Sequence, residues 1–76
     1  MVDVAVGVHY RIRRFMTKDR RARDLFISFG LIPGVLIEIK NRLYGGRYWV
    51  IRVHDQLIGL RETELQQLQL YVVTDC

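Results

Sequence analysis

The stretch that decides the fold is residues 35–53, which read VLIEIKNRLYGGRYWVIRV. Apolar residues occupy alternate positions on both sides of its centre, at Val35, Ile37 and Ile39 and again at Trp49, Ile51 and Val53. This period of two is typical of strands that bury one face. Residues 44–47 read Tyr-Gly-Gly-Arg and favour a tight turn, because glycine adopts positive φ without strain. The stretch predicts an antiparallel hairpin with strands at 35–40 and 48–53.

The segments before this hairpin predict a strand and then a helix. Val8, Tyr10 and Ile12 alternate with polar residues, which predicts a half-buried strand over 8–16. Residues 19–29 change to helical spacing, with Thr17 or Asp19 available as a cap and Gly30 where the helix would end. Pro33-Gly34 then predicts a type II turn into the hairpin.

The segments after the hairpin predict two more strands and one helical turn. Residues 54–56, His-Asp-Gln, indicate a tight turn before a strand over 57–61. Thr63 and Gln66 have the spacing of a capping box, which predicts a single helical turn. Residues 68–73 follow as a last strand. Together these elements predict a mainly β fold: a small five-stranded barrel with one short α-helix between the first two strands and a single helical turn before the last strand.

Length and composition indicate a single domain spanning residues 1–76. Half of the residues are apolar and 26% are charged, which is ordinary for a folded domain. A lone cysteine, Cys76, cannot form an internal disulfide, and neither a signal peptide nor a membrane-spanning apolar run is recognisable. We therefore expect a cytoplasmic protein without direct membrane insertion. Its net charge of +4 is uneven, since residues 1–30 contain seven basic and three acidic side chains.

Two motifs, about thirty residues apart, resemble the FeoA family. Gly30-Leu-Ile-Pro-Gly34, at the end of the predicted helix, is similar to the Gly-Leu-x-Pro-Gly of that family, and Leu60-Arg-Glu-Thr-Glu64 is similar to its Leu-Arg-x-x-Glu. Gly7 and Ile51-Arg-Val53 also match. The chain departs from the pattern at Leu65, where the family usually has Ala, and at Asp55, where it usually has Gly; Asp tolerates a left-handed turn conformation. The resemblance implies a barrel of the SH3-like kind. The same barrel occurs as the C-terminal domain of DtxR-like regulators, but the absence of a helix-turn-helix segment favours the free-standing kind.

No residue pattern predicts catalysis or a cofactor. The chain has neither a phosphate-binding loop nor a recognisable nucleophile and base, so we expect a protein that is not an enzyme. The potential metal ligands are His9, His54, Asp55 and Cys76. Of these, His54 and Asp55 are weak candidates because polar residues are common in turns, and we predict no metal site.

The residues predicted to bind a partner come from two segments. The first is the basic run that contains Arg11, Arg13, Arg14, Lys18, Arg20, Arg21 and Arg23. Such a run is either a solvated face or a surface for an acidic protein, an anionic membrane or nucleic acid. The segment that follows this run contains four large apolar residues, more than one short helix needs to pack on a small barrel: Leu25, Phe26, Phe29 and Leu31. The second segment is the hairpin tip. The predicted partner-binding residues are Arg20, Arg21, Leu25, Phe26, Tyr44 and Arg47.

The resemblance implies an accessory role in ferrous-iron uptake. It implies that the chain binds the cytosolic part of FeoB, a membrane ferrous-iron transporter with a GTPase domain, and supports or regulates it. The sequence leaves the oligomeric state open. One alternative is a small basic barrel that binds nucleic acid, motivated by the isoelectric point of about 9.7. The other is a regulator-type domain that binds a peptide.

Overall fold

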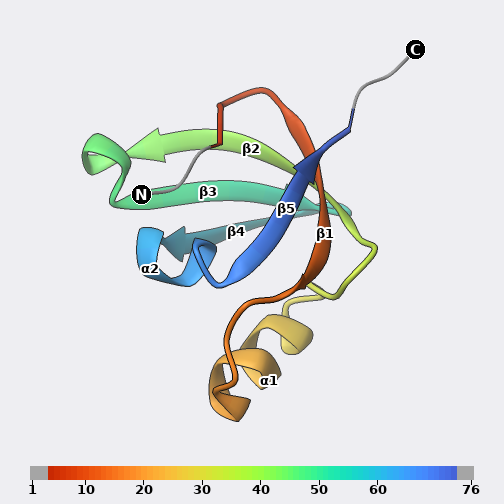
Figure 1. Cartoon of the computed structure of the whole chain (residues 1–76). Helices are drawn as coiled ribbons and strands as arrows, with labels where there is room; N and C mark the ends of the chain where they lie inside the picture. The colour runs from red at the N-terminus through yellow and green to blue at the C-terminus, as the bar shows by residue number, and fades with distance from the viewer. Residues whose placement is uncertain (1–3, 74–76) are drawn as a thin grey trace.

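The computed structural model describes residues 4–73 and contains five strands in one antiparallel sheet. The strands are β1 (His9–Phe15), β2 (Leu36–Leu43), β3 (Tyr48–Val53), β4 (Gln56–Arg61) and β5 (Leu68–Val72). The helices are α1 (Arg20–Ser28), α2 (Glu62–Leu65) and the 3₁₀ turn η1 (Tyr44–Gly46). The sheet order is β4-β3-β2-β1-β5, as Figure 1 shows. The predicted element order, including the helix after β1 and the helical turn before β5, is confirmed.

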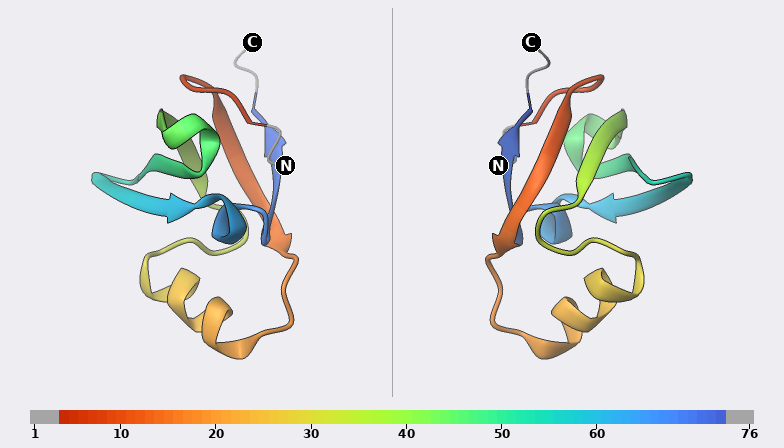
Figure 2. Two further views of the ribbon diagram at one scale, coloured as in Figure 1. Left: turned by 90° about the vertical axis from the view of Figure 1, so that its left-hand side faces the viewer. Right: turned by 90° about the vertical axis from the view of Figure 1, so that its right-hand side faces the viewer.

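The sheet is strongly curved but is not closed into the predicted barrel. Within the described chain β4 and β5 each pair with one neighbour only, so they are the two edges of the sheet. Register shifts between Ile12 and Arg14 and between Ile39 and Asn41 increase the local twist and bend the sheet. The single turn of α2 joins the two edge strands, as Figure 2 shows, and its Leu65 is buried.

The core lies on the concave side of the sheet and follows the predicted alternation. Ile37, Ile39, Ile51, Val53 and Trp49 are all buried, so the inward face of the central hairpin is confirmed. Val35 is only half-buried, because it precedes β2 rather than belonging to it. β1 contributes Tyr10 and Ile12, and the remaining buried residues are Phe26, Leu31, Ile58, Leu60, Leu65 and Leu68.

Helix α1 begins and ends where the sequence predicts. Asp19 is the cap, and its side chain accepts a hydrogen bond from the Arg21 N–H at 3.1 Å. The Thr17 hydroxyl instead accepts from the Asp19 N–H, so Thr17 supports the cap residue and does not cap the helix itself. Gly30 has φ of 82°, the left-handed conformation that ends many helices. Phe26 is the one buried residue of α1.

Two predicted turn details are wrong. In the β3–β4 hairpin the left-handed residue is His54, with φ of 55°, and not Asp55. The first turn residue, His54, therefore adopts the left-handed conformation. Because Asp55 does not need a positive φ, having Asp at this position instead of the family's Gly causes no backbone strain. Helix α2 begins at Glu62, one residue before the predicted cap Thr63. The Glu64 carboxylate accepts from the Arg61 N–H at 2.8 Å, so the family-like Arg61 and Glu64 close this turn and Thr63 and Gln66 do not.

Neither α-helix in the described part of the chain is long and apolar enough to cross a membrane.

Candidate functional site

The hairpin tip between β2 and β3 is a rigid turn that holds one aromatic ring in solvent. Tyr44, Gly45 and Gly46 all have positive φ, which closes the turn within three residues. The buried Trp49 indole N–H donates to the Gly46 carbonyl oxygen at 2.9 Å, and the Arg42 guanidinium donates to the Gly45 carbonyl oxygen at 3.2 Å. These two hydrogen bonds therefore hold the backbone of the tip in one conformation. Above it, the Tyr44 side chain is 78% exposed.

A second aromatic ring extends this surface onto β4. The Tyr48 ring lies edge-on to Tyr44, with 6.5 Å between ring centroids. Tyr48 covers Gly59 of the neighbouring strand so closely that a Cβ at position 59 would overlap the Tyr48 ring. The lack of a side chain at position 59 thus sets the ring position. A glycine inside a predicted strand is a recognised sign of such close approach, and the sequence prediction did not use it.

Arg47 completes the hairpin-tip surface, which we define as Tyr44, Arg47 and Tyr48. The Arg47 side chain is exposed, while its carbonyl oxygen accepts from the Glu62 N–H at 2.9 Å and so joins the tip to the start of α2. A guanidinium and two tyrosine rings on a fixed backbone are the side chains that most often dominate protein–protein binding energy. The predicted residues Tyr44 and Arg47 are therefore both exposed at the hairpin tip.

The other predicted partner-binding residues lie elsewhere. Arg20, Arg21 and Leu25 are exposed on α1, next to the start of β2, whereas η1 follows the end of β2. An eight-residue strand such as β2 spans about 25 Å, and Figure 1 shows α1 and η1 far apart. The predicted set is thus divided between two ends of the molecule and does not form one patch.

The prediction that Phe26 binds a partner is wrong. Its side chain is 1% exposed and its ring stacks on Phe15 with centroids 5.8 Å apart. Helical spacing could not separate Phe26 from Leu25, but on the helix Phe26 faces the sheet and Leu25 stands beside it, 42% exposed. Phe26 therefore anchors α1 to the core and is not available to a partner.

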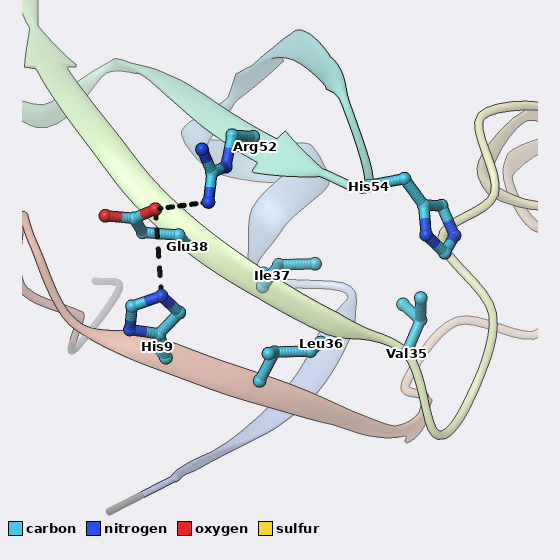
Figure 3. A pocket seen from close by; sticks show the side chains of 7 residues that line it. All are labelled: His9, Val35, Leu36, Ile37, Glu38, Arg52 and His54. Atoms are coloured by element: carbon cyan, nitrogen blue, oxygen red, sulfur yellow. Dashed lines mark ion pairs between the residues drawn. The ribbon is translucent and has the colours of Figure 1, made fainter. Parts of the chain in front are cut away.

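The weak metal candidates are not brought together. An open hollow of about 210 Å³ is lined by His9, Val35, Leu36, Ile37, Glu38, Arg52 and His54, and Figure 3 shows these side chains. His9 and Glu38 face each other there, with 3.7 Å between His9 Nε2 and Glu38 Oε1, while His54 lies at the other end and Asp55 is not part of the lining. Residues 4–73 contain no cluster of three His, Cys, Asp or Glu side chains that could hold a metal ion. Cys76 lies outside the described residues.

Glu38 is a feature that the sequence prediction did not single out. It lies opposite His9 on β1 and Arg52 on β3, so the three side chains form a row across the sheet. Its carboxylate is 3.5 Å from Arg52 Nη2 and 3.7 Å from Lys40 Nζ. Lys40, Arg52 and the His9 imidazole thus share one partly buried carboxylate, and the ion pairs found among residues 4–73 all involve it.

Solved structures with this fold come from several bacteria. An FeoA-like protein from Clostridium acetobutylicum matches with a TM-score of 0.84 and 16% identity, covering 97% of this chain and 85% of the other. The iron(II) transport protein A from Clostridium thermocellum has the same TM-score and 27% identity, with 92% of this chain covered, but this chain spans only 43% of that one. An FeoA protein from Chlorobium tepidum reaches a TM-score of 0.85 at 12% identity, covering 95% of this chain and 68% of the other.

No curated protein matches the chain at a significant level. The family model described as "FeoA domain" matches residues 1–72, which includes both motifs noted in the sequence. The chain therefore belongs to the FeoA domain family.

Proposed function

We propose that this chain is a cytoplasmic accessory protein of ferrous-iron uptake that binds the cytosolic part of an FeoB-like transporter through its hairpin-tip surface. Family membership supports the iron connection, as do solved relatives described as iron(II) transport protein A and as iron uptake regulatory protein. The role requires neither catalysis nor a bound metal. The chain contributes a shaped surface, and the transporter contributes the chemistry.

The observation that carries this proposal is the exposure of Tyr44 on an immobilised turn. A tyrosine ring that is 78% exposed gains little from its position in the isolated chain, since nearly all of its apolar area contacts water. Its backbone is already fixed by Trp49 and Arg42, so burying the ring against a partner would cost little additional conformational entropy. Rigid aromatic anchors of this kind bind tightly for their size.

The experiment is a binding titration of the purified chain against the cytosolic part of the transporter, without lipid. Tyr44→Ala is expected to weaken binding about 30-fold, the effect of losing an interface anchor worth about 2 kcal/mol. Alanine keeps the Cβ, so the positive φ at position 44 is equally strained in both proteins, and the lost edge-on contact with Tyr48 should lower stability by only about 1 kcal/mol. Arg47→Ala is expected to weaken binding about 10-fold.

The matched control is Leu57→Ala, which removes a 66% exposed apolar side chain from β4 outside the defined surface. It should bind like the unaltered chain. Equal losses for Leu57→Ala and Tyr44→Ala would reject the hairpin-tip surface, and no measurable binding by the unaltered chain would reject the transporter as partner. A parallel anaerobic titration with ferrous iron should show no binding at micromolar concentrations, because the accessory role does not depend on a metal site.

The peptide-binding alternative shares this fold and differs only in its partner. It predicts that the same Tyr44→Ala change weakens binding to a short extended peptide of the transporter as much as to its folded domain.

A further inference from the structure

The net charge of the molecule is concentrated in the helical end, which we define as residues 13–32. This segment contains six basic side chains and two acidic ones, a net charge of +4, which equals the net charge of the whole chain. The remaining residues carry equal numbers of both signs. Figure 2 shows that α1, within this segment, forms one extremity of the molecule.

Three arginine side chains of the helical end contact other side chains, and each of these partners is uncharged. Arg14 Nε donates to the Gln69 side-chain oxygen at 2.7 Å, the Arg13 guanidinium lies 5.0 Å from the centre of the Tyr71 ring, and that of Arg23 lies 5.7 Å from the centre of the Phe15 ring. These contacts orient the guanidinium groups without cancelling their charge. By contrast, Lys40 and Arg52 on the sheet share the carboxylate of Glu38.

The acidic side chains of the segment do not neutralise it. Asp19 is committed to capping α1, where its carboxylate accepts from the Arg21 N–H. Asp24 is exposed one turn after Arg20 and offsets at most one charge. The segment therefore presents a persistent positive potential to anything that approaches it.

Exposed aliphatic side chains accompany these charges. Ile27 is 51% exposed and lies one turn after Arg23 and two turns after Arg20, so the three share one stripe of α1. Met16, which follows β1 directly, is 52% exposed. A cationic stripe that includes aliphatic side chains is the pattern of helices that lie at the surface of an anionic bilayer.

The shape of the helical end favours a bilayer over a protein as its partner. Figure 2 shows α1 projecting at one extremity of the molecule, so it offers a protruding face. Its exposed apolar residues are aliphatic, whereas protein interfaces favour aromatic anchors seated in pockets. A bilayer adapts to a protruding face, and long arginine and lysine side chains can reach its phosphates while aliphatic groups enter between headgroups.

We propose that the helical end is a peripheral contact site for anionic phospholipid surfaces, with Lys18, Arg20 and Arg23 binding lipid phosphates and Ile27 entering the headgroup region. The site is independent of the hairpin-tip surface at the other end of β2. Both can be occupied together, which would place the protein at a membrane with its aromatic surface free for a protein partner.

The test is flotation of the full chain with vesicles of equal parts phosphatidylglycerol and phosphatidylcholine, compared with vesicles of phosphatidylcholine alone. Binding is expected only with phosphatidylglycerol and should fall steeply as salt is added. Lys18→Gln combined with Arg20→Gln should lower the partition coefficient about 30-fold, at about fivefold for each cation removed near the surface. Ile27→Ser should lower it about fivefold, because half of this side chain is free to be buried.

The matched control is Arg52→Gln combined with Arg61→Gln, which removes the same charge from the sheet. It should bind vesicles within about twofold of the unaltered chain in buffer of about 0.1 M salt, since Arg52 lies on β3 and Arg61 on β4, outside the helical end, and screening weakens distant charges. An equal loss in the control, equal binding to both vesicle types, or no binding at low salt would overturn the proposal.

Two further outcomes would also overturn it. One is tight binding to a duplex oligonucleotide with no binding to vesicles, which would assign the same cations to nucleic acid. The other is that the variant carrying Lys18→Gln and Arg20→Gln no longer binds the cytosolic part of the transporter in the absence of lipid. That result would assign the helical end to a protein partner. The lipid-free titration of Tyr44→Ala is unaffected by either result, so failure of this site and failure of the proposed function can be told apart.

Discussion

The two ends of the domain are built differently. The hairpin tip is part of the sheet, and its three left-handed residues are held by a buried indole and a guanidinium. Helix α1 lies outside the sheet and has one buried residue, Phe26. The hairpin tip presents tyrosine rings on a fixed backbone, and the helical end presents uncompensated cations and aliphatic side chains. Rigid aromatic side chains are typical of surfaces that bind a folded protein. Cationic and aliphatic side chains together are typical of surfaces that bind a lipid bilayer.

The largest expected effect tests whether one residue holds the helical end in place. Phe26→Ala should lower the free energy of unfolding by about 3–5 kcal/mol, because it empties a closed part of the core and removes the stacking on Phe15. A chain of this length has roughly 4–11 kcal/mol in total, so the variant should be close to unfolding. Urea titration measures this, and amide exchange should show that α1 loses protection before β3.

Leu25→Ala is the control for this prediction, since it changes the neighbouring exposed position on the same helix. It should cost less than about 1 kcal/mol. Similar costs for Phe26→Ala and Leu25→Ala would mean that α1 is attached by contacts other than the buried ring.

The next effect tests whether Gly59 sets the shape of the hairpin-tip surface. Gly59→Ala should lower the free energy of unfolding by about 1–3 kcal/mol, because the added methyl group would overlap the Tyr48 ring. In a chain that already carries Tyr48→Ala, the same change should be neutral or slightly stabilising, since alanine restricts the unfolded chain more than glycine does. A double-mutant cycle by urea titration measures the coupling, and additive effects would contradict the assigned contact.

The features that the sequence predicted correctly depend on neighbours in the chain. Alternation at Ile37 and Ile39 placed the core face of β2, and the cap at Asp19 and the left-handed Gly30 bounded α1. These are local rules, because the period of a strand and the unpaired groups of a helix end do not depend on distant segments.

The features that the sequence did not reveal depend on contacts between segments. Whether Phe26 or Leu25 faced the core required the direction from which the sheet covers α1. The exchange of roles between His54 and Asp55 required the register of the β3–β4 hairpin, and the position of Tyr48 over Gly59 required the pairing of two strands. The chain order did not show that β4 and β5 stay unpaired at the two edges of the sheet, with α2 between them in the sequence. Periodicity reports which face a residue takes and not what lies against it.

A smaller effect concerns the start of the helical end. Asp19→Ala should cost about 1 kcal/mol, because the Arg21 N–H loses its acceptor at the first turn of α1. Asp24→Ala, which removes the same charge from an exposed position further along α1, is the control and should change stability by less than about 0.5 kcal/mol. Thermal unfolding of the two variants at one pH separates capping from simple charge removal, and equal shifts would show that charge alone is responsible.

The smallest effect concerns Glu38, which lies between the two ends on β2. Glu38→Gln should cost only about 0.5–1 kcal/mol at low salt, because its partners His9, Lys40 and Arg52 remain exposed to water. The cost should shrink at high salt, since screening weakens the ion pairs in the unaltered chain but leaves the glutamine variant unchanged. Urea titration at two salt concentrations measures the difference. A cost that is large and independent of salt would mean that the carboxylate is effectively buried, and the middle of the sheet would then be held together by charge as firmly as the hairpin tip is held by its aromatic contacts.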